Sequence, residues 1–554
     1  MSDRDKPLLV QSDRTILLDL SSPDAEKARL DIIPFAELVK SPEHMHTYTI
    51  SPMSLWNAIS AGLSADKILS RLEKWSRYQI DQRVLFFIED TASRYGNFVL
   101  KENPDDPERL LLSVKKKLFF MQLSASSLAR KHLRPEGDGT FSLARLDRGK
   151  IKVELIKMGF PVDDRIPLSR GEHVDIRLRD TFKPRDYQIT AVNSFLGNGE
   201  SGTGFGTIVL PCGSGKTIVG LLAASRLETR TLILCPNVQS VHQWMRELIE
   251  KTEIPKEMIG EYSGEEKEIR PITVSTYQIL TYRKPGCEDY AHFSLLRDGR
   301  WGFIIYDEVH MLPAPVFRIT AELQSVYRLG LTATLIREDG REDEVFSLVG
   351  PKRYDSPWSE LASKGYIAEA YCHEIRVPLR EEDEVKYALA SKREKYRIAS
   401  TNISKLEIID YLVKKHSDDS ILVIGQYIDQ LEEIRKRFSW PLITGKTSNK
   451  VRDEIYQKFR DKEIRVLIVS KVANFAIDLP DCSVAIQVSG TFGSRQEEAQ
   501  RLGRILRPKE RSSHFYTIIT EYSEEEEFAM NRQKFLSEQG YSYSLERTDG
   551  KGLQ

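Results

Sequence analysis

The residues with the clearest chemical capability lie where an apolar run, Gly206–Leu210, gives way to glycines and then to a helix-forming sequence. An apolar, β-branched run of this kind predicts a buried parallel strand. In a glycine turn that leads into a helix, backbone N–H groups and the helix N-terminus attract phosphate oxygens. Lys216 can then reach the β- and γ-phosphates, and the Thr217 hydroxyl can bind Mg²⁺. We therefore predict a nucleotide-binding loop, whose turn residues are Pro211, Cys212, Gly213, Ser214 and Gly215.

An acidic pair, Asp307 and Glu308, directly follows the apolar stretch Phe303–Tyr306, which is expected to be a strand. The carboxyl end of a parallel strand is where α/β proteins bind their ligands. There, Asp307 would hold Mg²⁺, directly or through water, and Glu308 would orient or deprotonate the attacking water. An isolated Asp-Glu pair is usually a solvated strand end, but its place downstream of a phosphate loop favours the catalytic role.

Hydroxyl and basic residues at the ends of other expected strands extend this prediction. Thr332 and Thr334 follow one strand, where they can couple the nucleotide site to the rest of the protein. Ser470 and Lys471 follow another strand in the second half of the chain. We expect Ser470 and Lys471 to link nucleic acid to the cleft that holds the nucleotide.

A pair of arginines, Arg504 and Arg507, lies three residues apart and therefore on one helical face. Directed at a phosphoryl group, they would stabilise its developing charge as an arginine finger does. A lone Arg-x-x-Arg is usually a surface charge pair, but this one lies in a lobe without other nucleotide chemistry. We assign Gln500, at the start of the same motif, to the nucleotide site.

The composition describes an ordinary globular protein of 554 residues, with 40% hydrophobic and 29% charged residues and a formal net charge of -1. Roughly three or four domains are expected at this length. Near-neutral charge provides no global basic field, so any contact with nucleic acid would depend on local basic tracks. The five cysteines are too far apart for a zinc knuckle, an iron–sulfur cluster or a disulfide framework. With no long apolar span and no signal sequence, we expect a cytoplasmic protein, nucleoid-associated when engaged, and no membrane partner.

Apolar runs separated by helical stretches predict an α/β fold of two doubly wound parallel-sheet lobes after a small mixed α/β region. We expect an N-terminal accessory domain over residues 1–103, a connector module over 104–178, a first lobe over 179–355 and a second lobe over 356–554. The expected strands are Thr207–Leu210, Thr231–Leu234, Ile272–Ser275, Phe303–Tyr306 and Tyr327–Leu331, and, after a charged segment at Arg380–Arg397, Ile421–Ile424, Arg465–Val469, Val484–Gln487 and Phe515–Ile519.

Local patterns also predict parts of the region before the lobes. A hairpin is predicted from the apolar pair Leu8–Val10 and Thr15–Leu18. Two helices are predicted from stretches that begin at Ser51 and Ser64, because each has a serine cap and apolar residues at helical spacing. Each stretch contains one tryptophan, which we expect in the core. The turn Asn103–Pro107 follows. Basic clusters then recur in the connector, and they predict either contacts with DNA backbone or merely solvated faces. They are Lys115–Lys117, Arg130–Lys131 and Arg148–Lys150.

These motifs, in this order, resemble those of the superfamily 2 helicases and translocases. The residues within the motifs resemble the XPB (Ssl2-type) family, in a compact prokaryotic version. Leu210 stands where the usual phosphate loop begins with glycine, which is the form found in many helicase motors. The resemblance covers nearly the whole chain and is weakest between about 105 and 178. The stretches that carry it are Leu210–Thr217, Asp307–His310, Leu329–Asp339, Gly493–Arg507 and Arg532–Tyr543, and more loosely residues 44–63.

The resemblance implies two RecA-like lobes of the P-loop NTPase class, ATP and Mg²⁺ as cofactors, and a 3′-to-5′ DNA helicase or double-strand translocase. Arg337, Glu338 and Asp339 match the motif that the family uses in unwinding rather than in ATP hydrolysis. Arg185 and Gln188 match the motif that reads adenine, for which planar donors and acceptors are suited.

The resemblance also implies accessory parts and a biological role. A damage-recognition-like module would precede the first lobe, and Glu381–Tyr396 is a short candidate for a thumb-like insertion in the second. DNA repair or transcription-coupled remodelling would be the setting. Archaeal relatives have a nuclease partner, so a nuclease is a possible partner here in addition to single-stranded, forked or duplex DNA.

We therefore predict an ATP-driven DNA motor that grips the DNA backbone without much sequence preference. Two alternatives remain open at this point. One is a double-strand translocase that does not separate strands. The other is an ATP-gated scaffold that recruits a nuclease, with its essential contacts in residues 1 to about 100.

Overall fold

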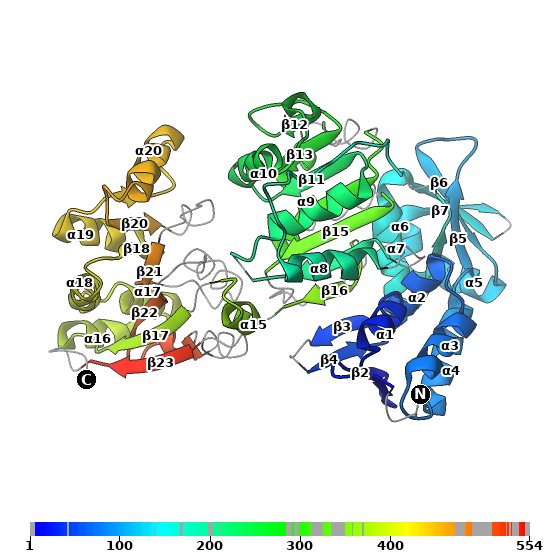
Figure 1. The fold of residues 1–554 in the computed structure, drawn as a ribbon, viewed down its shortest axis with the longest axis horizontal. Helices are drawn as coiled ribbons and strands as arrows, with labels where there is room; N and C mark the ends of the chain where they lie inside the picture. The colour runs from blue at the N-terminus through cyan, green and yellow to red at the C-terminus, as the bar shows by residue number, and fades with distance from the viewer. Residues whose placement is uncertain are drawn as a thin grey trace. The chain divides into compact units, whose positions relative to one another are not determined.

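The structure is a computed structural model, and the chain divides in it into two compact units (Figure 1). One unit comprises Met1–Val209 with Lys216–Asp355, and the other comprises Ser356–Gln554 with Leu210–Gly215. Within the described ranges, no helix combines the length and the hydropathy needed to cross a bilayer. The described residues are 6–40, 44–137, 139–166, 170–197, 203–211, 213–283, 291–292, 299–311, 325–333, 349–356, 358–367, 370–470, 482–489, 512–527, 529–530, 533 and 542–548.

The first unit begins with a small sheet in the order β1-β2-β4-β3, covered by helices. The predicted hairpin is confirmed, because β1 and β2 pair antiparallel. The two predicted serine-capped helices are α2 and α3, in which Ser51 and Ser64 accept backbone N–H groups of the first turn. Trp56 and Trp75 are buried, as expected. The elements are β1 (Leu8–Val10), β2 (Thr15–Asp19), α1 (Ala25–Ile32), β3 (Glu37–Lys40), β4 (Met45–Thr49), α2 (Pro52–Ser60), α3 (Ala65–Trp75) and α4 (Gln82–Arg94).

A second sheet, in the order β7-β8-β6-β5-β9, occupies the connector region. Asn103–Pro107 joins β5 to β6, which pair antiparallel, so this turn lies inside the sheet and not between two domains. Among the basic clusters, Arg148 is buried and pairs with Asp164 at 2.9 Å, so it is not available as a surface cation. The elements are β5 (Phe98–Glu102), β6 (Arg109–Val114), α5 (Lys117–Ala125), α6 (Ser127–His132), β7 (Leu133–Gly137), β8 (Thr140–Ala144), α7 (Arg148–Lys157) and β9 (Val162–Asp164).

The first parallel sheet has the order β12-β13-β11-β14-β15-β10-β16. Every strand that the sequence predicts for the first lobe is present, and the pairs are parallel. Helices α8, α9 and α10 pack against the sheet (Figure 1). The two edge strands, β12 and β16, were not predicted. The elements are α8 (Asp186–Leu196), β10 (Phe205–Val209), α9 (Lys216–Leu227), β11 (Thr231–Cys235), α10 (Val238–Lys251), β12 (Ile259–Tyr262), β13 (Ile272–Thr276), α11 (Tyr277–Leu280), β14 (Phe303–Asp307), β15 (Tyr327–Thr332) and β16 (Lys352–Asp355).

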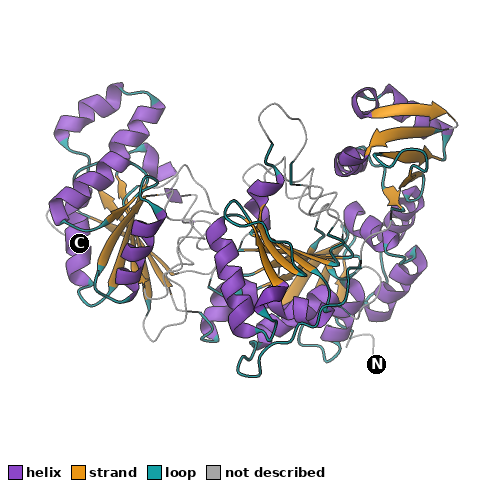
Figure 2. Cartoon of the chain, turned by 90° about the horizontal axis from the view of Figure 1, so that it is seen from above, coloured by secondary structure: helices purple, strands orange, loops and turns teal. Residues whose placement is uncertain are grey.

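The second parallel sheet has the order β19-β20-β18-β21-β22-β17-β23, with helices on both of its faces (Figure 2). The prediction that its strands begin after the charged segment is wrong. Strand β17 precedes that segment and pairs in parallel with both β22 and β23. The charged segment itself forms helices α16 and α17. The elements are α15 (Trp358–Ser363), β17 (Ala370–Val377), α16 (Glu381–Leu389), α17 (Lys392–Ser400), α18 (Lys405–Lys415), β18 (Ser420–Gly425), α19 (Ile428–Phe438), β19 (Leu442–Ile443), α20 (Asn449–Arg460), β20 (Val466–Ser470), β21 (Cys482–Gln487), β22 (Ser513–Thr520) and β23 (Ser542–Arg547).

Candidate functional site

The glycine turn between β10 and α9 has the backbone that a phosphate cradle requires. Gly213 and Gly215 have φ angles of 80° and 78°, which is the left-handed region that residues with a side chain rarely adopt. Ser214 is buried and donates its hydroxyl to the Pro211 carbonyl at 2.6 Å. That hydrogen bond closes the turn from inside, so the chain enters α9 directly at Lys216.

Lys216 lies beside the predicted catalytic carboxylate. Its Nζ is 3.4 Å from Glu308 Oε1, and both side chains are largely buried. His310 Nδ1 is 3.4 Å from the other oxygen, Oε2. Burial alone would raise the pKa of Glu308, but the charges of Lys216 and His310 and a hydrogen bond from Lys216 lower it. Glu308 is therefore held ionised, as a residue that orients or deprotonates water must be.

Asp307 ends β14, and N–H donors fix both of its carboxylate oxygens. Trp244 Nε1 donates to Oδ2 at 3.0 Å, and the Glu308 backbone N–H donates to Oδ1 at 3.1 Å. Tyr277 donates its hydroxyl to the Asp307 carbonyl at 2.8 Å. Burial, followed by the charge of Glu308, raises the pKa of Asp307 to about 6, against the effects of Trp244 and Lys216. A divalent cation would reverse this shift.

These residues fit Mg²⁺. Mg²⁺ prefers hard oxygen ligands and is commonly held by one or two carboxylates together with phosphate and water. Asp307 supplies such an oxygen pair, and among the described residues Glu308 Oε2 is buried without a hydrogen-bond donor. Thr217, one residue after Lys216, is partly buried in the first turn of α9.

The Leu331–Thr332 end of β15 is joined to the acidic strand end. Strands β14 and β15 pair so that Asp307 lies opposite Leu331. Thr332 is buried and lies 2.6 Å, Oγ1 to Nδ1, from His310. A direct hydrogen bond therefore connects Thr332, the predicted coupling residue, to His310, which contacts Glu308.

The two residues assigned to adenine lie at the start of α8. Gln188 is buried and accepts the Arg185 backbone N–H through Oε1 at 2.9 Å, which caps the helix. Both side chains lie 3.5 Å from the Tyr187 hydroxyl. Ser470 ends β20 and is buried.

Several predicted site residues lie outside the described residues, so their assignments stay predictions. They are Cys212, Thr334, Arg337, Glu338, Asp339, Lys471, Gln500, Arg504 and Arg507.

Sequence reasoning missed Trp244, Tyr277 and His310 as partners of the acidic pair. The available signal was indirect, because a buried indole or phenol needs a hydrogen-bond partner. Nothing local to Trp244 indicates that its partner lies 63 residues later.

Three family models match parts of the chain. The model described as "ERCC3/RAD25/XPB C-terminal helicase" matches residues 361–550. The model "Type III restriction enzyme, res subunit" matches residues 181–337, and "Helicase conserved C-terminal domain" matches residues 8–135.

Curated relatives match the chain over nearly its whole length. It is 47% identical to "DNA 3'-5' helicase XPB" of Mycobacterium tuberculosis, over 98% of each chain. It is 32% identical to "General transcription and DNA repair factor IIH helicase/translocase subunit XPB" of Enterocytozoon bieneusi, over 98% of this chain and 93% of that protein.

A solved structure supports the fold alone. A fragment of a putative HsdR subunit of a type I restriction enzyme from Vibrio vulnificus matches 67% of this chain and 69% of that one, at 17% identity and a TM-score of 0.50. Together with the parallel sheets, this similarity shows an α/β fold with two parallel-sheet lobes.

Proposed function

The chain belongs to the XPB family of DNA helicases, and we propose that it is an ATP-dependent DNA helicase that moves 3′-to-5′ along DNA. The direction is that of the bacterial relative's name. The eukaryotic relative's name supports a role in DNA repair or in transcription-coupled remodelling.

The observation that carries this proposal is the placement of Lys216 and Glu308, 3.4 Å apart, beside the hydrogen-bonded carboxylate of Asp307. Lys216 forms an ion pair with Glu308. We propose that phosphate oxygens compete for Lys216 when ATP binds, and that Glu308 is then free to orient water for attack on the γ-phosphate.

Asp307 and Thr217 are proposed to hold Mg²⁺, which neutralises charge on the phosphates when it is bound. The backbone of Pro211, Gly213 and Gly215 would bind phosphate oxygens, as glycine turns before helices do. We propose that adenine binds at the start of α8, where Arg185 and Gln188 lie.

The remaining assignments are proposals from the family pattern. Arg504 and Arg507 would stabilise charge on the transferring phosphoryl group, with Gln500 at the start of their motif. Thr332, through its hydrogen bond with His310, would couple hydrolysis to movement, and Thr334 would share that role. Ser470 and Lys471 would link nucleic acid to the nucleotide site. DNA is the proposed substrate, and a nuclease partner remains a proposal.

A strand-displacement assay on 3′-tailed, 5′-tailed, blunt and forked DNA, with RNA as the control, tests the proposed function. We expect ATP-dependent displacement on the 3′-tailed and forked substrates, together with DNA-stimulated release of phosphate. Displacement of a triplex without displacement of a duplex strand would instead identify a double-strand translocase, a word that the eukaryotic relative's name also contains.

Replacement of Arg337 by alanine separates unwinding from hydrolysis. Because Arg337, Glu338 and Asp339 match the family's unwinding motif, Arg337→Ala should lose strand displacement while it retains most of its DNA-stimulated ATPase activity. Parallel measurements of both activities test this expectation. An equal loss of the two would contradict a separate role in unwinding.

A further inference from the structure

We propose that Trp244 is a positioning residue for the metal-binding carboxylate of Asp307, and that the helix of the phosphate loop holds Trp244 in place. This inference rests on the proposed ATP- and Mg²⁺-dependent function. It adds a residue, from a different helix, on which the geometry of the metal site depends.

The hydrogen bond from Trp244 has only one possible direction. An indole N–H donates and cannot accept, so Oδ2 of Asp307 must be the acceptor in the 3.0 Å contact. The backbone N–H of Glu308 occupies one acceptor position on Oδ1. With one donor on each oxygen, the plane of the carboxylate is fixed, and the remaining lone pairs are left for a cation.

The position of the indole ring is itself set by close packing. Trp244 lies on α10 and is only 1% exposed. Gly220 on α9 makes room for the ring, because a Cβ at Gly220 would lie 2.5 Å from Trp244 Cη2 and 3.3 Å from Ile305 Cδ1. The ring is therefore enclosed between the helix that begins at Lys216 and the strand that ends at Asp307.

This arrangement joins the two halves of the predicted nucleotide site. Lys216 starts the helix that carries Gly220, and Asp307 ends the strand that carries Ile305. A side chain larger than glycine at position 220 would displace the indole ring from the position in which Nε1 reaches Asp307. Gly220 is therefore needed for the packing of the indole ring, which is a different role from that of the turn glycines in the phosphate loop.

The test measures binding of a fluorescent, non-hydrolysable ATP analogue to the full-length protein, first in EDTA and then with increasing Mg²⁺. For Trp244→Phe, we expect unchanged affinity in EDTA and at least a tenfold increase in the Mg²⁺ concentration that gives half of the metal-dependent change. This magnitude is that of other residues that orient a metal ligand, about 10- to 100-fold. Gly220→Ala should produce a shift in the same direction.

Two matched variants control for loss of packing. Trp301→Phe changes a buried tryptophan of the same unit that lies against Arg230, and Gly264→Ala adds a Cβ where nothing lies within 4 Å. Both should retain the wild-type Mg²⁺ dependence, and melting temperatures show which variants are folded.

The outcomes separate this inference from the proposed function. If Trp244→Phe has the wild-type Mg²⁺ dependence, the positioning role is refuted. If Trp244→Phe instead loses affinity in EDTA as much as in Mg²⁺, its role is structural and the inference is also refuted. If the wild-type protein binds no ATP analogue at all, the proposed function itself fails.

Discussion

Glu308 occupies an uncommon backbone conformation at the centre of the candidate site. Its φ angle of 48° lies in the left-handed region, which costs a non-glycine residue of order 1–3 kcal/mol. The carboxylate that this conformation presents contacts Lys216 on one oxygen and His310 on the other. One residue thus links the phosphate loop to the strand end that leads to Thr332.

Replacement of Glu308 by glutamine should separate ATP binding from hydrolysis. Glutamine cannot accept a proton from water, so we expect the rate of DNA-stimulated hydrolysis to fall by about 10²- to 10⁴-fold. ATP affinity should be retained or increased, because Lys216 loses a competing carboxylate. Single-turnover hydrolysis and equilibrium binding test the two expectations, with the exposed Glu257→Gln as a control. Near-wild-type phosphate release would contradict the assignment.

At the scale of elements, the strands β17 and β22 place two imidazoles in contact. His373 Nε2 lies 3.2 Å from His514 Nδ1, and His373 Nδ1 lies 2.7 Å from Ser544 Oγ on β23. Burial, with the nearby charges of His514, Lys415 and His416, lowers the pKa of His373 to about 4. Burial followed by the charge of His416 also lowers the pKa of His514.

This pair predicts that acid destabilises the second unit. Since the unfolded chain has a histidine pKa near 6.5, it binds more protons than the folded protein between about pH 4 and 6.5. The free energy of unfolding should therefore decrease as the pH falls from 7 to 5. Melting curves across this range test the sign, and His373→Asn should reduce the slope. The exposed His173→Asn should leave the slope unchanged; equal slopes in all three proteins would contradict the interpretation.

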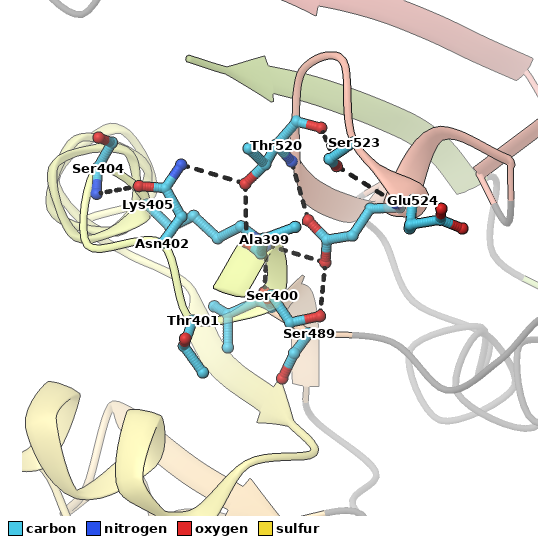
Figure 3. A network of polar contacts seen from close by, with 12 residues as sticks. Ala399, Ser400, Thr401, Asn402, Ser404, Lys405, Ser489, Thr520, Ser523 and Glu524 are labelled. Atoms are coloured by element: carbon cyan, nitrogen blue, oxygen red, sulfur yellow. Dashed lines mark hydrogen bonds and ion pairs between the residues drawn. The ribbon is translucent and has the colours of Figure 1, made fainter. Parts of the chain in front are cut away.

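A buried ion pair joins helix α18 to the short helical stretch at residues 524–527, which follows β22. Lys405 and Glu525 are 1% and 3% exposed, and Lys405 Nζ lies 2.8 Å from Glu525 Oε2. Lys405 also donates to the Val488 carbonyl at the end of β21, at 2.9 Å. Figure 3 shows the surrounding contacts, in which Asn402 donates to Thr520 at 3.1 Å. The network fixes one end of the second sheet.

Replacement of Lys405 by methionine should strongly destabilise the second unit. Breaking a buried pair leaves an uncompensated charge, for which losses of about 3–5 kcal/mol are typical. Lys414→Met on the same helix removes an exposed pair with Asp410 and should cost less than about 1 kcal/mol. Denaturant unfolding of the two variants tests the difference. Equal losses would show that the buried pair contributes no more than a surface pair.

At the scale of the whole molecule, a buried arginine connects the N-terminal region to the first parallel sheet. Arg353 on β16 is 2% exposed and donates to the carbonyls of Ile33 and Phe205. Its neighbour Lys352 donates to the Val39 carbonyl at 3.0 Å. Burial lowers the pKa of Arg353 to about 9, opposed by the charge of Glu37, so the guanidinium is still charged at neutral pH.

Loss of this arginine should loosen the N-terminal region from the sheet. Arg353→Met leaves two carbonyls without a donor, at about 1–3 kcal/mol for each buried group. We expect faster hydrogen exchange and proteolysis within residues 6–94, whereas the exposed Arg83→Met should resemble the wild type. Mass spectrometry of both variants provides the measurement. Unchanged exchange in Arg353→Met would show that other contacts alone secure the region.

The sequence by itself determined the parts of the protein that depend on local pattern. Strand, glycine turn and helix follow one another between Phe205 and Leu227, because β-branched residues, glycines and helix formers succeed each other there. The acidic pair likewise follows from its place after an apolar run. The interiors of both sheets could be predicted because buried parallel strands are continuous apolar stretches.

Only the tertiary structure decided which distant groups meet. The strands β12, β16, β17 and β23 escaped prediction because they carry mixed polar residues. The strands β16, β17 and β23 also pair with strands far away in sequence. The contact between Trp244 and Asp307 could not be predicted either, because the two residues are far apart in sequence. A hydrogen bond between residues 63 positions apart depends on how α9, α10 and β14 pack, and no local pattern specifies that a glycine on one helix admits an indole from the next.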